Sequence, residues 1–385
     1  MEESWPAWGR HETASVVQLH RPDQRVGADR GNRPATGGYD QAELQRGIDK
    51  LHDLGVTGIV ARVSTTRGEF RAVSGVADLK HPEPPRPDSR FRIASVTKTF
   101  VATTLLQLAG EGRVSLDDTV NRWLPGVLKE NVDKITVRYL LQHRSGLFNY
   151  TEADWPATPE EYERTKYVYE QPEALIKIAN DHPSRFEPGS RSQYSNTDFI
   201  VLGMILEKVT GRPWGDSVRD RIIRPLHLTG TTDPGADATM PDPHATGYSQ
   251  FAEHGPLVDT TISASNYADG ALLSTTQDVN TFFRALLGGR LLPPAIQRQL
   301  LTDLVDFDYE GDKAYRAGYG IFRHPLPCGG YRWEHLGGTL GYQTLAATTQ
   351  DGKRSVVVSR SSDNWDNWAQ INEQVMHIAD QALCG

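Results

Sequence analysis

The spacing of apolar residues predicts a chain that alternates between helices and strands. An amphipathic helix is expected at 39–54, followed by strands at 57–63 and 69–76 that a TTRG turn joins. Further helices are expected at 160–170, 172–180, 197–210, 215–223 and 276–287, the last capped by Ser274 or Thr275 with Asp278 in its first turn. Strands return near 319–322, 331–335, 341–348 and 355–359, before a final helix at 365–383.

This order of elements predicts an α+β fold, an α/β sandwich in which helices cover an antiparallel sheet and a helical lobe is inserted. The α/β lobe would comprise about 41–112 and 270–385, and the inserted all-helical lobe about 113–269. We expect 41–385 to form a single unit. Residues 1–40 are polar and rich in Gly, Arg, Asp and Pro, which is typical of a flexible N-terminal arm.

Composition and charge narrow the classes of protein that fit. Hydrophobic residues make up 38% and charged residues 23% of the 385 positions, as in an ordinary soluble protein. The formal net charge of −8 gives no basic surface for nucleic acid and no reason to expect an anionic membrane as partner. No apolar run approaches the roughly 20 residues that span a bilayer.

The first residues do not have the pattern of a secretion signal. Acidic residues stand where such a signal needs basic ones, and the apolar pair Val16-Val17 is too short for its hydrophobic region. We therefore expect a cytoplasmic protein, although a chain from which a signal had been removed, and which is secreted, would look the same.

The chain contains two cysteines, Cys328 and Cys384. Two cysteines cannot supply a four-ligand zinc site, and no histidines are spaced to complete one. They either pair or are ordinary buried thiols, and a reducing cytoplasm favours free thiols.

The segment 91–112 carries the first candidate chemistry. It turns at Ser95 from an extended apolar stretch into a helix, and Lys98 follows one turn later on the same face. The unpaired N–H groups of a helix start and the Lys98 ammonium both stabilise an alkoxide-like serine, so Ser95 is a candidate nucleophile that forms an acyl-enzyme. The alternative is an N-capping serine with a solvated lysine behind it, because S-x-x-K occurs by chance in many helices.

Two further stretches carry candidate groups. Tyr194, on a loop before the helix at 197–210, can accept the serine proton if a nearby cation lowers its pKa, and Asn196 can hold a substrate amide or the lysine. His335 ends an aromatic-rich strand and is followed by glycines that allow a backbone to approach a ligand closely. Taken singly, each has a structural alternative: a packed tyrosine in a turn, and a structural histidine beside Trp333.

Together, and in this order, these motifs resemble the active-site triplet of the penicillin-recognising serine enzymes: S-x-x-K, then Y-x-N, then K/H-x-G. The segments LLQHRSGLFNYT and FEPGSRSQYSNTDFIVLGMILEKVTGRPW are also similar to segments of that family. The likeness covers about 45–385. It is strongest to actinomycete D-alanyl-D-alanine carboxypeptidases and weaker to class C β-lactamases.

This resemblance implies the β-lactamase/DD-peptidase fold and a role for each motif residue. Ser95 would be the nucleophile, Lys98 its hydrogen-bonded cationic partner, and Tyr194 the general base that later protonates the leaving group. Asn196 would position the substrate, and His335 would support the proton transfer of the tyrosine electrostatically.

The resemblance also implies an oxyanion hole made of the backbone N–H groups of Ser95 and Gly338. The acyl group would pass to Ser95 and then to water or an amine, with no cofactor and no metal. Because the carboxypeptidases carry cysteines at matching places, Cys328 and Cys384 are expected to be neighbours that could form a disulfide. Their oxidation state stays open.

The third motif departs from the carboxypeptidase pattern at the positions that hold the substrate. Leu336 and Gly338 flank the motif glycine, Gly337, where the carboxypeptidases have threonines that hold the terminal carboxylate. Phe322 stands in the place of an arginine with the same task, and Arg323 is one residue away. Each lost charge-assisted hydrogen bond costs roughly 1.5–3 kcal/mol, so selectivity for a free carboxylate should be largely lost.

These departures predict a serine acyltransferase or esterase. Its acyl donor would be a small molecule or peptide with a neutral ester, amide or thioester, as in family members of natural-product assembly, and its acceptor water or an amine. The alternative is a D-alanyl-D-alanine carboxypeptidase or weak class C-like β-lactamase that anchors the carboxylate with Arg323 or another base. A third hypothesis is a non-catalytic binder of the same fold. The sequence does not indicate the oligomeric state.

Overall fold

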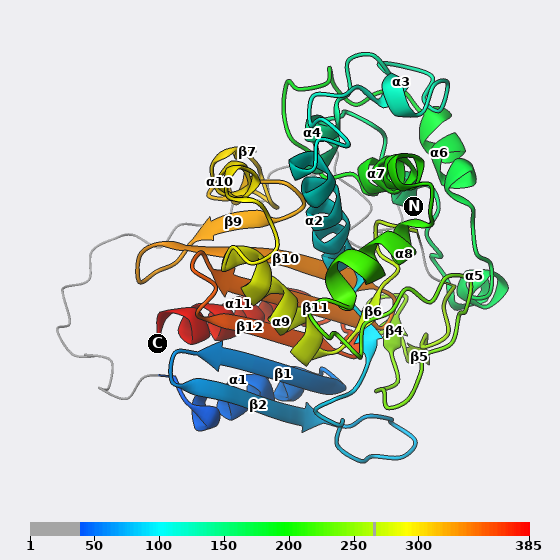
Figure 1. The fold of residues 1–385 in the computed structure, drawn as a ribbon. Helices are drawn as coiled ribbons and strands as arrows, with labels where there is room; N and C mark the ends of the chain where they lie inside the picture. The colour runs from blue at the N-terminus through cyan, green and yellow to red at the C-terminus, as the bar shows by residue number, and fades with distance from the viewer. Residues whose placement is uncertain (1–38, 265–266) are drawn as a thin grey trace, which may run out of the picture.

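The computed structural model describes residues 39–264 and 267–385, and an eight-stranded sheet forms its centre (Figure 1). The strand order is β2-β1-β12-β11-β10-β9-β8-β7, and every neighbouring pair is antiparallel. The strands are β1 (Gly58–Thr65), β2 (Gly68–Gly75), β7 (Val305–Asp306), β8 (Arg316–Ala317), β9 (Phe322–Pro325), β10 (Tyr331–Thr339), β11 (Tyr342–Thr349) and β12 (Ser355–Arg360). The arm expected at 1–40 lies, up to residue 38, outside the described residues.

Helices cover both faces of this sheet. The first and last helices, α1 (Gln41–Asp53) and α11 (Trp368–Cys384), pack together on one face, and α9 (Thr276–Leu287) lies on the other. Alternation along β12 separates the two hydrophobic cores: Val356 and Val358 pack towards α1 and α11, whereas Val357 faces the opposite core. The predicted α+β fold with a helix-covered antiparallel sheet is confirmed.

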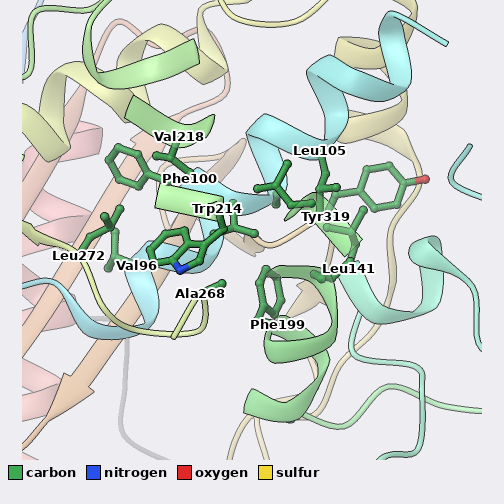
Figure 2. Packing of buried hydrophobic residues seen from close by; sticks show 14 of the residues in the cluster. Val96, Phe100, Leu105, Leu141, Phe199, Trp214, Val218, Ala268, Leu272 and Tyr319 are labelled. Atoms are coloured by element: carbon green, nitrogen blue, oxygen red, sulfur yellow. The ribbon is translucent and has the colours of Figure 1, made fainter. Parts of the chain in front are cut away.

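The helix α2 (Thr97–Gly110) lies at the centre of the larger core, between the sheet and the helical part. Residues 97–106 and 108 are all buried, so this helix is covered on every side rather than amphipathic. Figure 2 shows Phe100 and Leu105 of α2 packed among Phe199, Trp214 and Leu272, which come from distant parts of the chain. Its buried threonines bond to backbone carbonyls, for instance Thr99 to Gly320.

The segment expected to be an all-helical lobe is mostly helical. It contains α3 (Val120–Trp123), α4 (Val137–Leu141), a 3₁₀ turn (Tyr150–Glu152), α5 (Pro159–Thr165), α6 (Pro172–Asn180), α7 (Asn196–Thr210) and α8 (Trp214–Val218), which continues into a π-helical turn (Arg219–Ile223).

The all-helical expectation is wrong for 248–259. Strands β4 (Tyr248–Gln250) and β5 (Leu257–Asp259) form a small sheet with β13 (Ser362–Asp363). Because β4 pairs with a strand more than one hundred residues away, its local pattern carries little signal. The remaining elements are β3 (Phe91–Arg92), β6 (Leu273–Ser274) and α10 (Pro294–Thr302).

Several predicted boundaries hold and others move. The helices at 172–180 and 276–287 begin and end where predicted, and Thr275 caps α9 through the backbone N–H of Asp278 at 3.2 Å. The helix expected at 160–170 ends at Thr165. The strand expected at 319–322 only begins at Phe322, because Gly320, at φ 65°, forms a turn before it.

The two cysteines are neighbours, as the resemblance implied, and they are bonded. The disulfide Cys328–Cys384 has a Cα–Cα distance of 5.7 Å and joins the turn between β9 and β10 to the end of α11. The expectation of free thiols is therefore wrong for this structure. In the described part of the chain, no helix combines the length and the apolar character needed to cross a membrane.

Candidate active site

Ser95 lies in a single 3₁₀ turn, Ala94–Val96, that leads directly into α2. Its hydroxyl makes no capping hydrogen bond, so the alternative of a simple N-cap does not hold. The preceding Ala94 has φ 46°, in the left-handed region that non-glycine residues rarely adopt. Such backbone strain is concentrated at functional sites, where the surrounding structure enforces it.

Two of the predicted partners meet the Ser95 hydroxyl. The Tyr194 hydroxyl donates to Ser95 Oγ at 2.8 Å, and Lys98 Nζ donates to the same oxygen at 3.0 Å. Lys98 Nζ also donates to Asn196 Oδ1 and to the backbone carbonyl of Asp269, each at 2.7 Å. Both distances to Ser95 Oγ are within the range for proton transfer. The structure thus brings Ser95, Lys98, Tyr194 and Asn196 together.

The environment of Lys98 destabilises its charged form. Its side chain is fully buried, and this burial lowers its pKa to about 8, against the opposing effect of the Asp269 and Asp198 carboxylates. A fraction of Lys98 is therefore unprotonated near neutral pH and able to accept a proton from Ser95.

Tyr194 has the opposite environment from the one expected. Burial raises the pKa of its phenol, and the hydrogen bond to Ser95 opposes this only in part. Lys98 Nζ lies 5.0 Å from the ring centroid, but burial sets the direction of the shift, and the nearby carboxylates of Asp269 and Asp198 also raise this pKa. The condition under which Tyr194 could accept the serine proton, a pKa lowered by a nearby cation, is therefore not met. Tyr194 is a neutral phenol in the resting site.

His335 is buried in β10 and is 1% exposed. Its Nδ1 lies 2.6 Å from the carbonyl oxygen of Leu336, so Nδ1 carries the proton, and Nε2 has no hydrogen-bond partner among the described residues. Burial, and next the charge of Lys98, lower its pKa to about 3. The imidazole is therefore neutral at ordinary pH. The expected electrostatic support of Tyr194 by His335 would thus come from a neutral imidazole, and this role stays a prediction.

The glycines of the third motif place β10 against the turn that carries Ser95. A Cβ on Gly337 would lie 2.1 Å from the carbonyl oxygen of Ile93, so only glycine allows this approach. The next residue, Gly338, lines the same cavity as Ser95. This arrangement supports the predicted oxyanion hole of the Ser95 and Gly338 N–H groups, which stays a prediction.

The other residues expected to bind substrate lie elsewhere. Phe322 is buried, with its ring centroid 4.8 Å from that of Phe307 and 5.3 Å from that of His335. The guanidinium carbon of Arg323 lies 4.0 Å from the ring centroid of Tyr331. Leu336 and Gly337 line a second cavity of about 440 Å³. None of Phe322, Arg323, Leu336 and Gly337 is on the wall of the Ser95 cavity.

A buried polar cluster beneath Tyr194 was not among the predicted site residues. The His143 ring centroid lies 4.5 Å from that of Tyr194, and His143 Nδ1 lies 3.1 Å from Asp198 Oδ2. The Ser145 hydroxyl donates to the same carboxylate. His143 and Ser145 lie in the segment LLQHRSGLFNYT, which is similar to a segment of the penicillin-recognising serine enzymes. This similarity is the feature of the sequence from which the cluster could have been predicted. Through these contacts the cluster positions the tyrosine without reaching the cavity wall.

The cavity beside Ser95 has a volume of about 510 Å³, which suits a small-molecule substrate. Tyr194, Asn196, Asp269 and Gly338 contribute to its wall. Most of the remaining wall is apolar or aromatic, including Phe148, Trp155, Pro156, Phe251, Leu340 and Trp365. Across 39–264 and 267–385, no three His, Cys, Asp or Glu residues are grouped so that they could hold a metal ion.

The sequence model of the family described as Beta-lactamase matches residues 44–380. The chain belongs to the beta-lactamase family. The resemblance to penicillin-recognising serine enzymes is thereby confirmed, and the protein is an enzyme of the serine hydrolase type.

Relatives within the beta-lactamase family have several activities in their names. A D-stereospecific amidohydrolase from Streptomyces sp. is 36% identical, with a TM-score of 0.79 over 87% of this chain and 98% of that one. D-amino acid amidase from Ochrobactrum anthropi SV3 is 27% identical, with a TM-score of 0.76 over 87% and 96%. Esterase EstB from Burkholderia gladioli is 33% identical over 236 residues, which cover 56% of this chain and 57% of the esterase.

Proposed function

We propose that Ser95 accepts the acyl group of a neutral amide or ester, with a D-configured amino acid as the acyl part, and passes it to water or an amine. The observation that carries this proposal is the position of Phe322 and Arg323 outside the Ser95 cavity. A D-alanyl-D-alanine carboxypeptidase needs a cation in the cavity, next to the leaving group, to hold the terminal carboxylate of its substrate.

Two cationic side chains near Ser95, those of Arg92 and Lys98, are already hydrogen-bonded within the protein. Arg92 is on the wall but is only 4% exposed, and it donates to the carbonyls of Ala238 and Thr261. Lys98 is bound to Ser95, Asn196 and the Asp269 carbonyl. A free carboxylate on the leaving group would thus enter without a matched partner, which disfavours the carboxypeptidase alternative.

The relatives support the same reaction class. The Streptomyces protein is named a D-stereospecific amidohydrolase, and the Ochrobactrum protein a D-amino acid amidase. The Burkholderia protein is named an esterase. Amides and esters both release a neutral leaving part, as the apolar cavity wall favours, and the aromatic side chains suit a large apolar acyl side chain.

The proton path follows from the two hydrogen bonds at Ser95. As Ser95 Oγ attacks the acyl carbon, its proton passes to the neutral amine of Lys98, whose pKa is the closer of the two to neutral pH. The Tyr194 phenol then donates its proton to the leaving amine or alcohol. The Lys98 ammonium, which lies beside the phenol because both groups contact Ser95 Oγ, returns a proton directly to the phenolate. The acyl-enzyme remains, with the site back in its starting protonation state.

The second half-reaction reverses these roles. Water or an amine attacks the acyl carbon and gives its proton to the site, and Ser95 Oγ leaves with a proton from the same groups. Asn196, held by Lys98 at 2.7 Å and by the Thr151 hydroxyl at 3.2 Å, is fixed at the cavity wall to orient the acyl part.

Acylation of Ser95 can be measured directly by intact mass and by turnover. D-phenylalanine methyl ester and D-phenylalaninamide should be consumed, and the L-enantiomers and the free-acid dipeptide D-Ala-D-Ala should react at least about tenfold more slowly. The Ser95→Ala variant should form no adduct. A preference for D-Ala-D-Ala would instead support the carboxypeptidase alternative, and no turnover of any activated ester would support the non-catalytic binder.

A further inference from the structure

Asp269 is one of the residues that line the Ser95 cavity, and its side chain is buried. The residue is 2% exposed and precedes Gly270, whose backbone passes beside Ala94. Its backbone carbonyl accepts a hydrogen bond from Lys98 at 2.7 Å, so the residue lies next to the reacting groups. The proton path described above does not use its side chain.

Only one of the two oxygens of the Asp269 carboxylate accepts a hydrogen bond from the described part of the chain. Oδ2 accepts a hydrogen bond from the Tyr150 hydroxyl at 2.9 Å, whereas Oδ1 is buried and has no partner among the described residues. Lys98 does not donate a hydrogen bond to Oδ1. The three N–H groups of its ammonium donate to Ser95 Oγ, Asn196 Oδ1 and the Asp269 backbone carbonyl.

The other carboxylates on the described wall differ in this respect. Glu152 is paired with Arg185. Asp363 accepts hydrogen bonds from the backbone N–H of Gly341, from Gln343 and from Ser249. Leaving a buried carboxylate oxygen without a donor is costly, so the vacant Oδ1 of Asp269 marks a place for a donor that arrives with a ligand.

We propose that Asp269 Oδ1 accepts a charge-assisted hydrogen bond from a protonated amino group on the acyl part of the substrate. The substrate class is then an amino acid amide or ester whose amino group is free rather than acylated. This inference rests on the proposed function, since it names the acyl donor of the same site. In this arrangement Asp269 supplies a negative group for the amino group of the acyl part. Neither Arg92 nor Lys98 is available to pair with a carboxylate on the leaving group.

The test compares two substrates that differ only at the amino group. For wild-type protein, kcat/KM for D-phenylalanine methyl ester should exceed that for N-acetyl-D-phenylalanine methyl ester by at least about tenfold. In Asp269→Asn this ratio should fall to near one, because the rate with the free amine drops while the rate with the acetylated ester is largely kept. Glu152→Gln, which removes an already paired carboxylate on the same wall, should leave the ratio unchanged.

Two results would overturn the role of Asp269. One is a wild-type preference for the acetylated ester. The other is an equal loss of rate with both esters in Asp269→Asn, which would show that the carboxylate only positions Lys98 or Tyr150.

Binding measurements keep this inference separate from the proposed function. In the Ser95→Ala background, calorimetric titration should show tighter binding of D-phenylalaninamide than of its N-acetyl form, and Asp269→Asn should abolish the difference. If wild-type protein turns over no ester while this difference is present, the proposed reaction is wrong and the amine site remains. If esters are turned over without any such difference, the amine site is wrong and the reaction remains.

Discussion

Lys98 is the residue whose protonation state should set the activity of the site. It is fully buried, its pKa is lowered to about 8, and it lies 3.0 Å from Ser95 Oγ. The Tyr194 hydroxyl is slightly closer to Ser95 Oγ, at 2.8 Å, but burial raises its pKa, so its phenolate is much harder to form. His335, with its pKa lowered to about 3, does not titrate in the working range.

We therefore predict that kcat/KM for an uncharged ester, such as N-acetyl-D-phenylalanine methyl ester, rises with pH and levels off above an apparent pKa of about 8. Below that pH, Lys98 is an ammonium that cannot accept the serine proton; above it, the neutral amine predominates. Lys98→Arg should lower kcat/KM by about 10²–10⁴-fold across the whole range, because a guanidinium keeps its proton. The measurement is a pH–rate profile from about pH 6 to about pH 10.

A matched variant distinguishes Lys98 from the neighbouring histidine. His335→Gln should leave the apparent pKa of the profile in place, whatever happens to its height. The opposite result would be a pH–rate profile whose rise has an apparent pKa of about 6.5, the ordinary value for histidine, and which loses this rise in His335→Gln. That result would show that His335 titrates and that Lys98 does not control the rate.

At the scale of elements, the site depends on how closely β10 approaches the turn that carries Ser95. Gly337 and Gly338 are consecutive on this strand, yet a side chain would meet different surroundings at each. A Cβ at Gly337 would meet the backbone carbonyl of Ile93 at 2.1 Å, whereas one at Gly338 would meet the side-chain amide of Gln343 at 2.7 Å. A side chain can rotate away, and a packed backbone cannot.

Gly337→Ala should therefore lower the free energy of unfolding by about 1–3 kcal/mol or more, by forcing strand and turn apart. It should also reduce acylation of Ser95, since that displacement moves Gly338 from the predicted oxyanion hole. Gly338→Ala is the control and should have a much smaller effect on stability. Thermal denaturation of both variants and the rate of Ser95 acylation measure this. Equal stability of the two variants would contradict the close approach.

At the scale of the whole molecule, the two ends of the described chain are held on one face of the sheet. Strand β1 pairs with β12, α1 packs on α11, and the N–H of Tyr39 donates to the carbonyl of Gly385 at 3.4 Å. The disulfide Cys328–Cys384 fastens α11 to the turn between β9 and β10 across a separation of 56 residues. The turn that leads into the strand carrying the third motif is thus covalently linked to the last helix.

Removing this bond should lower the free energy of unfolding by about 2–4 kcal/mol, since it closes a long loop in the unfolded chain. Cys328→Ser and Cys384→Ser should show the same loss in denaturant unfolding, and so should wild-type protein in a reducing agent. The reducing agent should have no further effect on either variant. Unchanged stability of wild-type protein on reduction would contradict this role.

Local sequence determined the parts of this protein that depend on neighbouring residues. The bounds of α6 and α9 follow from a proline at the first position, a capping threonine and an apolar stripe, all within one segment. The motif residues Ser95, Lys98, Tyr194 and Asn196 could be chosen because each lies in a recognisable short pattern. The departures at Leu336 and Gly338 were also visible in the sequence.

Tertiary structure alone decided which of these groups carry charge and which are left without a partner. The raised pKa of Tyr194, the neutral state of His335 and the vacant oxygen of Asp269 all result from burial by segments far apart in the chain. The pairing of β4 with β13 has the same origin. Desolvation depends on everything that surrounds a group, and long-range pairing depends on a distant partner, so neither is contained in a local pattern.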